Sequence, residues 1–158
     1  MANLALTMRP QPWTEILRAG TPKPSLLISA RPHYGLVPDR DPEWFDVLLS
    51  VDDVFSGEIE TCWFAEDLVA LAAGLADLAR TSNEPRSFAT GGNRAAEVRF
   101  TASTAIPDRD QIAVEIWMTP NGDDPSTALT LLLFSARLEL GGAAQRLERL
   151  LTSSAARP

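Results

Sequence analysis

Hydrophobic and polar residues alternate over several short stretches of the chain, a period of two that is typical of β-strands with one buried face. Residues 44–51 and residues 55–64 form two such stretches, and the acidic pair 52–53 provides the turn between them. The pattern predicts a β-hairpin with a hydrophobic face and a polar face. Three acidic residues share the polar face: Asp46, Glu58 and Glu60.

Four more segments have the character of strands. Residues 25–32 begin with a β-like run and end at a proline, and residues 96–102 and 112–118 alternate in the same way as the hairpin. Residues 128–137 are rich in leucine on both faces, which is typical of a strand covered on both sides. We therefore expect this last strand to lie in the centre of a sheet.

Two segments have the period of an amphipathic helix. In residues 66–80 and 142–152, hydrophobic residues recur at intervals of three and four, with charged residues between them. Short connections between the strands favour antiparallel neighbours. Together these elements predict an α+β fold with one antiparallel sheet of about five to six strands packed against two helices.

The predicted elements define the domain organisation. Residues 1–24 contain Pro10, Pro12, Pro22 and Pro24 and predict an irregular N-terminal arm. Within this arm, residues 13–17 fit either a short helix or an edge strand that attaches the arm to the core. We expect residues 25–152 to form a single domain and residues 153–158 to fray.

Composition restricts the classes of partner. The chain has 158 residues, a formal net charge of −7 and 45% hydrophobic residues, which fits one globular domain and argues against nucleic acid or an anionic membrane as its partner. Cys62 is the single cysteine, so an internal disulfide is excluded and a reducing cytoplasm is expected. No apolar run approaches the length of a membrane-spanning helix.

The negative charge is concentrated in one segment. Residues 39–67 contain ten acidic residues and one basic residue, so this segment has a net charge of −9 and the rest of the chain +2. An acidic sheet face is a docking surface for a basic partner, but acidic residues on a sheet edge also prevent aggregation, and both interpretations stay open. The candidate contact residues are Asp46, Asp52, Asp53, Glu58, Glu60, Trp44 and Trp117.

Motifs for catalysis or cofactor binding are absent from the sequence. It contains no nucleophile elbow, phosphate-binding loop, dinucleotide fingerprint or zinc-protease helix, and we therefore expect no enzyme activity, cofactor or metal. His33 lies near Asp39, Asp41 and Glu43, but their spacing matches no ligand pattern. Cys62 has aromatic neighbours and no basic residue nearby in sequence, which favours a structural thiol over a nucleophile.

The order of these elements resembles that of the WapI-like immunity proteins of bacterial toxin systems. The resemblance covers about residues 25–152 and follows element order and hydrophobic pattern. It lies in the following residues: Asp41-Pro42-Glu43-Trp44-Phe45, Phe64-Ala65-Glu66-Asp67-Leu68, Leu71, Leu75, Leu78, Val98-Arg99-Phe100, Ile112 to Trp117, Leu147, Leu150 and Leu151. The proline-rich residues 9–24 have no counterpart in the family pattern.

The resemblance implies a non-enzymatic cytoplasmic protein that binds and neutralises a cognate toxin. Nuclease toxins are basic where they meet nucleic acid, so the acidic segment is compatible with such a partner. The alternative is a small-molecule-binding or regulatory α+β domain with a pocket between the sheet and the helix at residues 66–80. The sequence leaves open whether the protein forms a homodimer.

Overall fold

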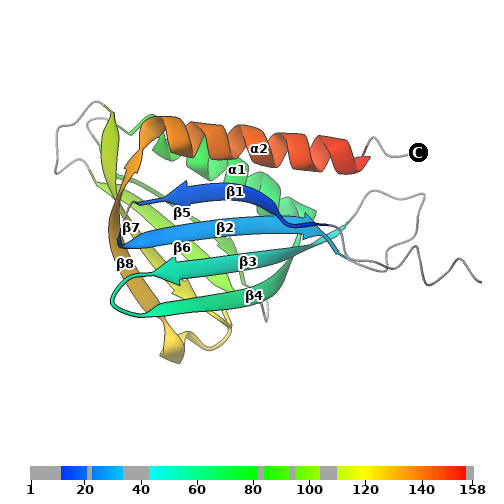
Figure 1. Cartoon of the computed structure of the whole chain (residues 1–158), viewed down its shortest axis with the longest axis horizontal. Coiled ribbons are helices and arrows are strands. Elements are labelled where there is room, and N and C mark those ends of the chain that lie inside the picture. Colours follow the sequence, from blue (N-terminus) through cyan, green and yellow to red (C-terminus); the bar gives the residue numbers. More distant parts are fainter. Residues whose placement is uncertain are drawn as a thin grey trace, which may run out of the picture.

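The computed structural model describes residues 12–20, 23–33, 43–81, 84–92, 95–103 and 110–155. Each half of the chain consists of four antiparallel strands followed by a helix (Figure 1). The first half comprises β1 (Thr14–Ala19), β2 (Ser25–Pro32), β3 (Trp44–Asp52), β4 (Ser56–Phe64) and α1 (Ala65–Leu78). The second comprises β5 (Arg86–Gly91), β6 (Glu97–Ser103), β7 (Gln111–Thr119), the 3₁₀ helix η1 (Pro125–Thr127), β8 (Leu129–Ala136) and α2 (Arg137–Ala155).

The strands form two sheets rather than one. Sheet A has the order β1-β2-β3-β4 and sheet B the order β5-β6-β7-β8. The α+β class and the antiparallel pairing are confirmed, but the prediction of a single sheet of five to six strands is wrong. The chain leaves β4 directly into α1, which carries it across to β5, so β4 stays an edge strand and a new sheet begins.

Two strands, β1 and β5, account for the difference between the predicted and the observed number of strands. β1 lies within residues 1–24, which the sequence predicts as an arm, and it is the edge strand that was one of the two alternatives there. Its Ile16 and Leu17 are completely buried, so this part of the arm belongs to the domain. β5 was not predicted because Phe88 is its only large hydrophobic residue.

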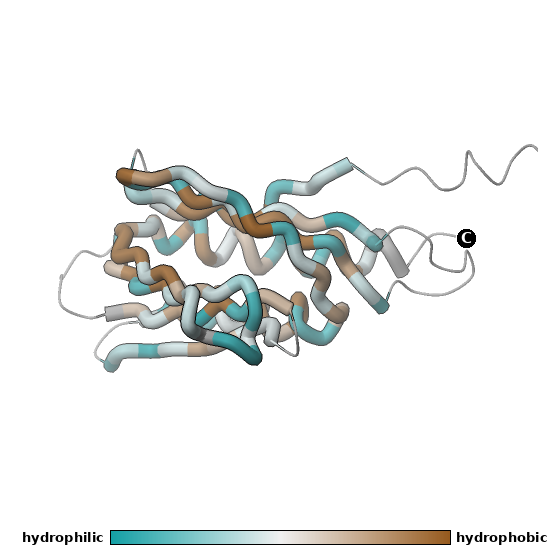
Figure 2. Tube along the Cα trace, turned by 90° about the horizontal axis from the view of Figure 1, so that it is seen from below, coloured by the Kyte–Doolittle hydropathy of each residue, from teal (hydrophilic) through white to brown (hydrophobic). Residues whose placement is uncertain are grey.

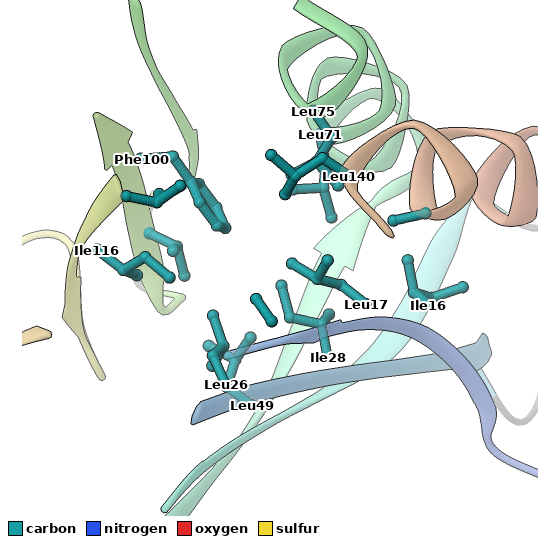
Figure 3. Close-up of a cluster of buried hydrophobic side chains, with 14 of the residues drawn as sticks. Ile16, Leu17, Leu26, Ile28, Leu49, Leu71, Leu75, Phe100, Ile116 and Leu140 are labelled. Carbon is teal, nitrogen blue, oxygen red and sulfur yellow. The ribbon is translucent and has the colours of Figure 1, made fainter. Parts of the chain in front are cut away.

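The hydrophobic core lies between the two sheets and the helix pair. Figure 3 shows side chains from sheet A, sheet B and both helices meeting in one cluster, including Leu17, Leu71, Phe100, Ile116 and Leu140. Figure 2 shows hydrophobic and hydrophilic residues alternating along the strands, as expected for strands with one buried face. All eight strands and both helices contribute side chains to this core or pack against it.

Each helix packs along the first strand of the other half. α1 lies against β5, where the Thr90 hydroxyl donates a hydrogen bond to the Asp67 carbonyl at 2.7 Å. α2 lies against β1, where Arg146 Nε donates to the Ile16 carbonyl at 2.8 Å, beside the irregularity in the β1–β2 register. The two halves therefore interlock, and neither half covers its own sheet alone.

Arg137 joins the two helices at their ends. It is the first residue of α2, and its guanidinium donates hydrogen bonds to the carbonyls of Ala79 and Thr81 just after α1 ends. The last turn of α1 contains no basic residue of its own, so Arg137 supplies the positive charge that a helix C-terminus favours.

Two further expectations are corrected. β8 is an edge strand and not a central one, and its outward-facing Leu132 and Phe134 are 61% and 48% exposed. The C-terminal helix begins at Arg137 rather than at residue 142, since it continues through Gly141 and Gly142 and buries Leu140. None of the helices in the described part of the chain is long and apolar enough to cross a membrane.

Two helical glycines give opposite predictions. A Cβ on Gly74 would clash with the ring of Phe88 on β5, whereas a Cβ on Gly141 would meet nothing within 4 Å. We expect Gly74→Ala to lower the free energy of unfolding by about 1–3 kcal/mol through overpacking. The matched variant Gly141→Ala should raise it by about 0.5–1 kcal/mol because alanine loses less entropy in a helix. Urea denaturation of both variants checks this, and equal signs would contradict the packing described.

Candidate functional site

The outer face of sheet A carries the predicted acidic residues. The register pairs Asp46 with Cys62, Leu48 with Glu60 and Ser50 with Glu58. Directly opposed residues on antiparallel strands point to the same face. The prediction that Asp46, Glu58 and Glu60 share one face is therefore confirmed.

Two of the predicted acids are paired with nearby basic residues. Arg31 Nε lies 3.1 Å from one carboxylate oxygen of Asp46, and His33 Nδ1 lies 2.6 Å from the other. Lys23 Nζ lies 3.4 Å from Asp52, which also accepts a hydrogen bond from the Ser56 hydroxyl at 3.0 Å. These two carboxylates hold the sheet together locally and contribute little net charge to a partner.

Glu58 and Glu60 carry the unbalanced charge of this face. Both side chains are exposed on β4, and neither forms an ion pair with any of the residues that the structure describes. The Ser50 hydroxyl donates a long hydrogen bond of 3.4 Å to Glu58. Because β4 is the edge of sheet A, this charge lies at the rim of the sheet and not at its centre.

An apolar groove of about 250 Å³ lies between the edges of the two sheets. One wall comes from β3, β4 and the turn between them, and the other from β7 and β8. Its lining is Leu49, Val51, Asp53, Phe55, Ser56, Gly57, Glu58, Ile59, Met118, Leu129, Thr130 and Leu131. Asp53 and Glu58 are the acidic members of this lining, so the groove combines an apolar floor with an acidic rim.

Exposed hydrophobic residues in the groove lining (Phe55, Leu129) and next to it (Val54) were not among the predicted contacts. Val54 and Phe55 at the tip of the β3–β4 hairpin are 86% and 85% exposed, and Leu129 at the start of β8 is 44% exposed. The sequence contains a signal for the first two, since two large hydrophobic residues stand in a turn between Asp53 and Ser56. Leu129 could not be found in this way, because its position depends on the crossing of the two sheets.

The two predicted tryptophans lie on different sheets. Trp44 is on the outer face of sheet A, where its ring lies 3.8 Å from that of Phe64. Trp117 is on the outer face of sheet B, with the Arg99 guanidinium 4.4 Å above its ring. Trp117 therefore does not lie beside Asp46, Glu58 and Glu60, and the seven predicted contact residues do not form one surface.

A second polar cluster lies at the other end of the outer face of sheet A. His33 Nδ1 lies 2.6 Å from Asp46 and 3.9 Å from Cys62 Sγ, so side chains from β3, β4 and the residue that follows β2 meet there. Asp39 and Asp41, which the sequence places near His33, lie outside the described residues. Burial raises the pKa of the Cys62 thiol, and the negative charge of Asp46 raises it further.

We expect the raised pKa of Cys62 to slow its alkylation. The thiolate is the reacting species, so the rate with iodoacetamide should stay low through neutral pH and rise only above the titration range of a free cysteine, about 8.5. The same chain in denaturant should react with the pH profile of a free thiol. A native profile with its midpoint at or below that of the denatured chain would contradict the arrangement of Asp46 beside Cys62.

Comparison with protein-family models and with curated proteins gives no match for this chain.

Proposed function

We propose that this chain is a non-enzymatic, immunity-like protein that binds a basic protein toxin in the cytoplasm and neutralises it. The observation that supports this proposal is the apolar groove with an acidic rim between β4 and β8. Acidic residues at the rim attract a basic partner over a distance, while an apolar floor holds the partner after contact.

The geometry of the groove favours an extended segment of the partner. Its walls include β4 and β8, which are the edge strands of their sheets. An edge strand has backbone groups free to pair with an added chain, and this mode of recognition combines backbone hydrogen bonds with pockets for alternate side chains. We propose that a partner segment with alternating aliphatic and basic side chains lies along this groove, with its basic residues facing Asp53 and Glu58.

The alternative of a small-molecule site beneath α1 has less support. Leu68, Leu71 and Leu75 of that helix are completely buried and belong to the core cluster. A ligand in that position would need space that these side chains occupy.

The proposal is tested by capture of the partner from the native cell. Tagged wild-type protein is expected to retain a basic protein that stops growth when it is produced alone in a heterologous host, and co-production of the wild-type chain should restore growth. The Glu58→Lys/Glu60→Lys variant should neither capture this protein nor restore growth, because it reverses the charge of Glu58 at the groove rim and of Glu60 beside it on β4.

The matched control is Glu84→Lys/Glu148→Lys. It makes the same change in net charge at two exposed residues outside the groove lining, one before β5 and one on α2. This variant should behave like the wild type. If both variants lose capture equally, net charge and not the groove explains binding, and if neither loses it, the groove is the wrong surface.

A further inference from the structure

The side chains of His33, Asp46 and Cys62 bring three kinds of metal ligand together. Their ligand atoms, an imidazole nitrogen, a carboxylate oxygen and a thiol sulfur, all lie within 4.8 Å of one another. The cluster takes one residue from each of three adjacent segments, and it lies apart from the groove between β4 and β8.

The backbone of sheet A fixes the three positions. Asp46 and Cys62 are directly opposed on β3 and β4. The backbone N–H of His33 donates a hydrogen bond to the Trp44 carbonyl at 2.9 Å, which extends the β2–β3 ladder by one residue. His33 is therefore the diagonal neighbour of Asp46 on the outer face, at a spacing that long side chains can bridge.

The separations are close to those of a tetrahedral zinc site. With zinc–nitrogen and zinc–oxygen bonds of about 2.0–2.2 Å and a zinc–sulfur bond of about 2.3 Å, tetrahedral ligand atoms lie roughly 3.3–3.7 Å apart. The distance from His33 Nδ1 to Cys62 Sγ is 3.9 Å, and that from His33 Nδ1 to Asp46 Oδ1 is 2.6 Å. Rotation of the His33 side chain, which is 45% exposed, would change both distances, because both are measured from its Nδ1.

A second layer of contacts orients the carboxylate. Arg31 Nε donates a hydrogen bond to Asp46 Oδ2, which leaves Oδ1 directed toward His33. The guanidinium of Arg31 is itself held 4.0 Å from the ring of Trp13. Outer contacts of this kind are a regular feature of metal sites, because they fix the orientation of the ligands.

We propose that His33, Asp46 and Cys62 bind a Zn²⁺ ion on the outer face of sheet A, with its fourth position open to solvent. A mixed set of nitrogen, oxygen and sulfur donors suits zinc better than the harder magnesium or calcium ions. This inference does not depend on the proposed function, because no residue of the groove takes part.

The test uses the full chain and Co²⁺ as a spectroscopic probe for the zinc site. One equivalent of Co²⁺ is expected to produce a thiolate-to-cobalt charge-transfer band, and Zn²⁺ should abolish it by displacement. Because Cys62 is the single cysteine of the chain, this band reports on one site only. His33→Gln and Cys62→Ser should each weaken binding of Zn²⁺ by about tenfold or more, since each removes one of three ligands.

Glu60→Gln is the matched control, since it changes an exposed carboxylate on the same face outside the cluster and should leave the Zn²⁺ affinity within about twofold. Zn²⁺ should also slow the alkylation of Cys62 by iodoacetamide in the wild type and in Glu60→Gln, but not in His33→Gln. The absence of a thiolate band, or equal Zn²⁺ affinity in the wild type and in Cys62→Ser, would overturn the proposal.

Discussion

Replacement of Trp63 by alanine is expected to lower the free energy of unfolding by about 3–5 kcal/mol, the range for removing a large aromatic side chain from a packed core. Trp63 is 1% exposed, and its indole N–H donates a hydrogen bond of 2.8 Å to the Ala96 carbonyl. The hydroxyl of Thr61 accepts a hydrogen bond from the Ala96 N–H at 3.0 Å. Trp63 and Thr61 on β4 thus tie the first half of the chain to the segment before β6.

Chemical denaturation followed by far-ultraviolet circular dichroism measures this loss. Trp63→Phe removes the indole hydrogen bond but keeps most of the buried side-chain volume. We therefore expect it to lower the free energy of unfolding less than Trp63→Ala does. The Ala96 carbonyl also accepts a hydrogen bond from the Gly92 N–H at 3.1 Å, so it keeps a donor when the indole is removed. An alanine variant with the unfolding midpoint of the wild type would show that β4 does not join the two halves in this way.

Truncation of the groove's hydrophobic residues should have the second large effect, on binding rather than on stability. We expect Phe55→Ser and Leu129→Ser each to weaken the affinity for the captured basic partner by about 30-fold or more, which corresponds to about 2 kcal/mol for a central contact residue. Phe55 is 85% exposed in the unbound chain, so its removal should change the free energy of unfolding very little. Calorimetric titration of the purified partner gives the dissociation constants.

Leu138→Ser provides the control for these truncations. Leu138 at the start of α2 is 91% exposed and lies outside the groove lining, so its loss removes an exposed hydrophobic residue without touching the proposed contact. Its affinity for the partner should equal that of the wild type. If Leu138→Ser lost as much affinity as Phe55→Ser, the groove would not be the surface that binds the partner.

The local elements of the fold could be predicted from the sequence, but their assembly could not. The period of two at residues 44–64 predicts β3 and β4 with the observed faces, because alternation depends only on which residues are buried. β8 is apolar on both faces in sequence and was predicted to be central, yet it lies at an edge with Leu132 exposed. The alternation of hydrophobic and polar residues shows which side chains of a strand are buried, but not which strands pair with it. The pattern therefore cannot distinguish one sheet from two.

The candidate site likewise has features that could be predicted from the sequence and features that could not. The shared face of Asp46, Glu58 and Glu60 follows from strand parity and could be predicted. The groove could not, because Phe55 and Leu129 are 74 positions apart in the chain and come together only where the sheets cross. The pairing of Asp46 with Arg31 and His33 also depends on the β2–β3 register, which the sequence pattern does not specify.

The proposed recruitment of a basic partner by the acidic groove can be measured through the association rate constant of the captured protein at low and at physiological ionic strength. The wild-type rate should fall steeply as salt screens the attraction. The Glu58→Lys/Glu60→Lys variant should associate about tenfold or more slowly at low salt, with little dependence on salt, while Glu84→Lys/Glu148→Lys should follow the wild type. Equal rates for the wild type and the Glu58→Lys/Glu60→Lys variant at low salt would contradict the account.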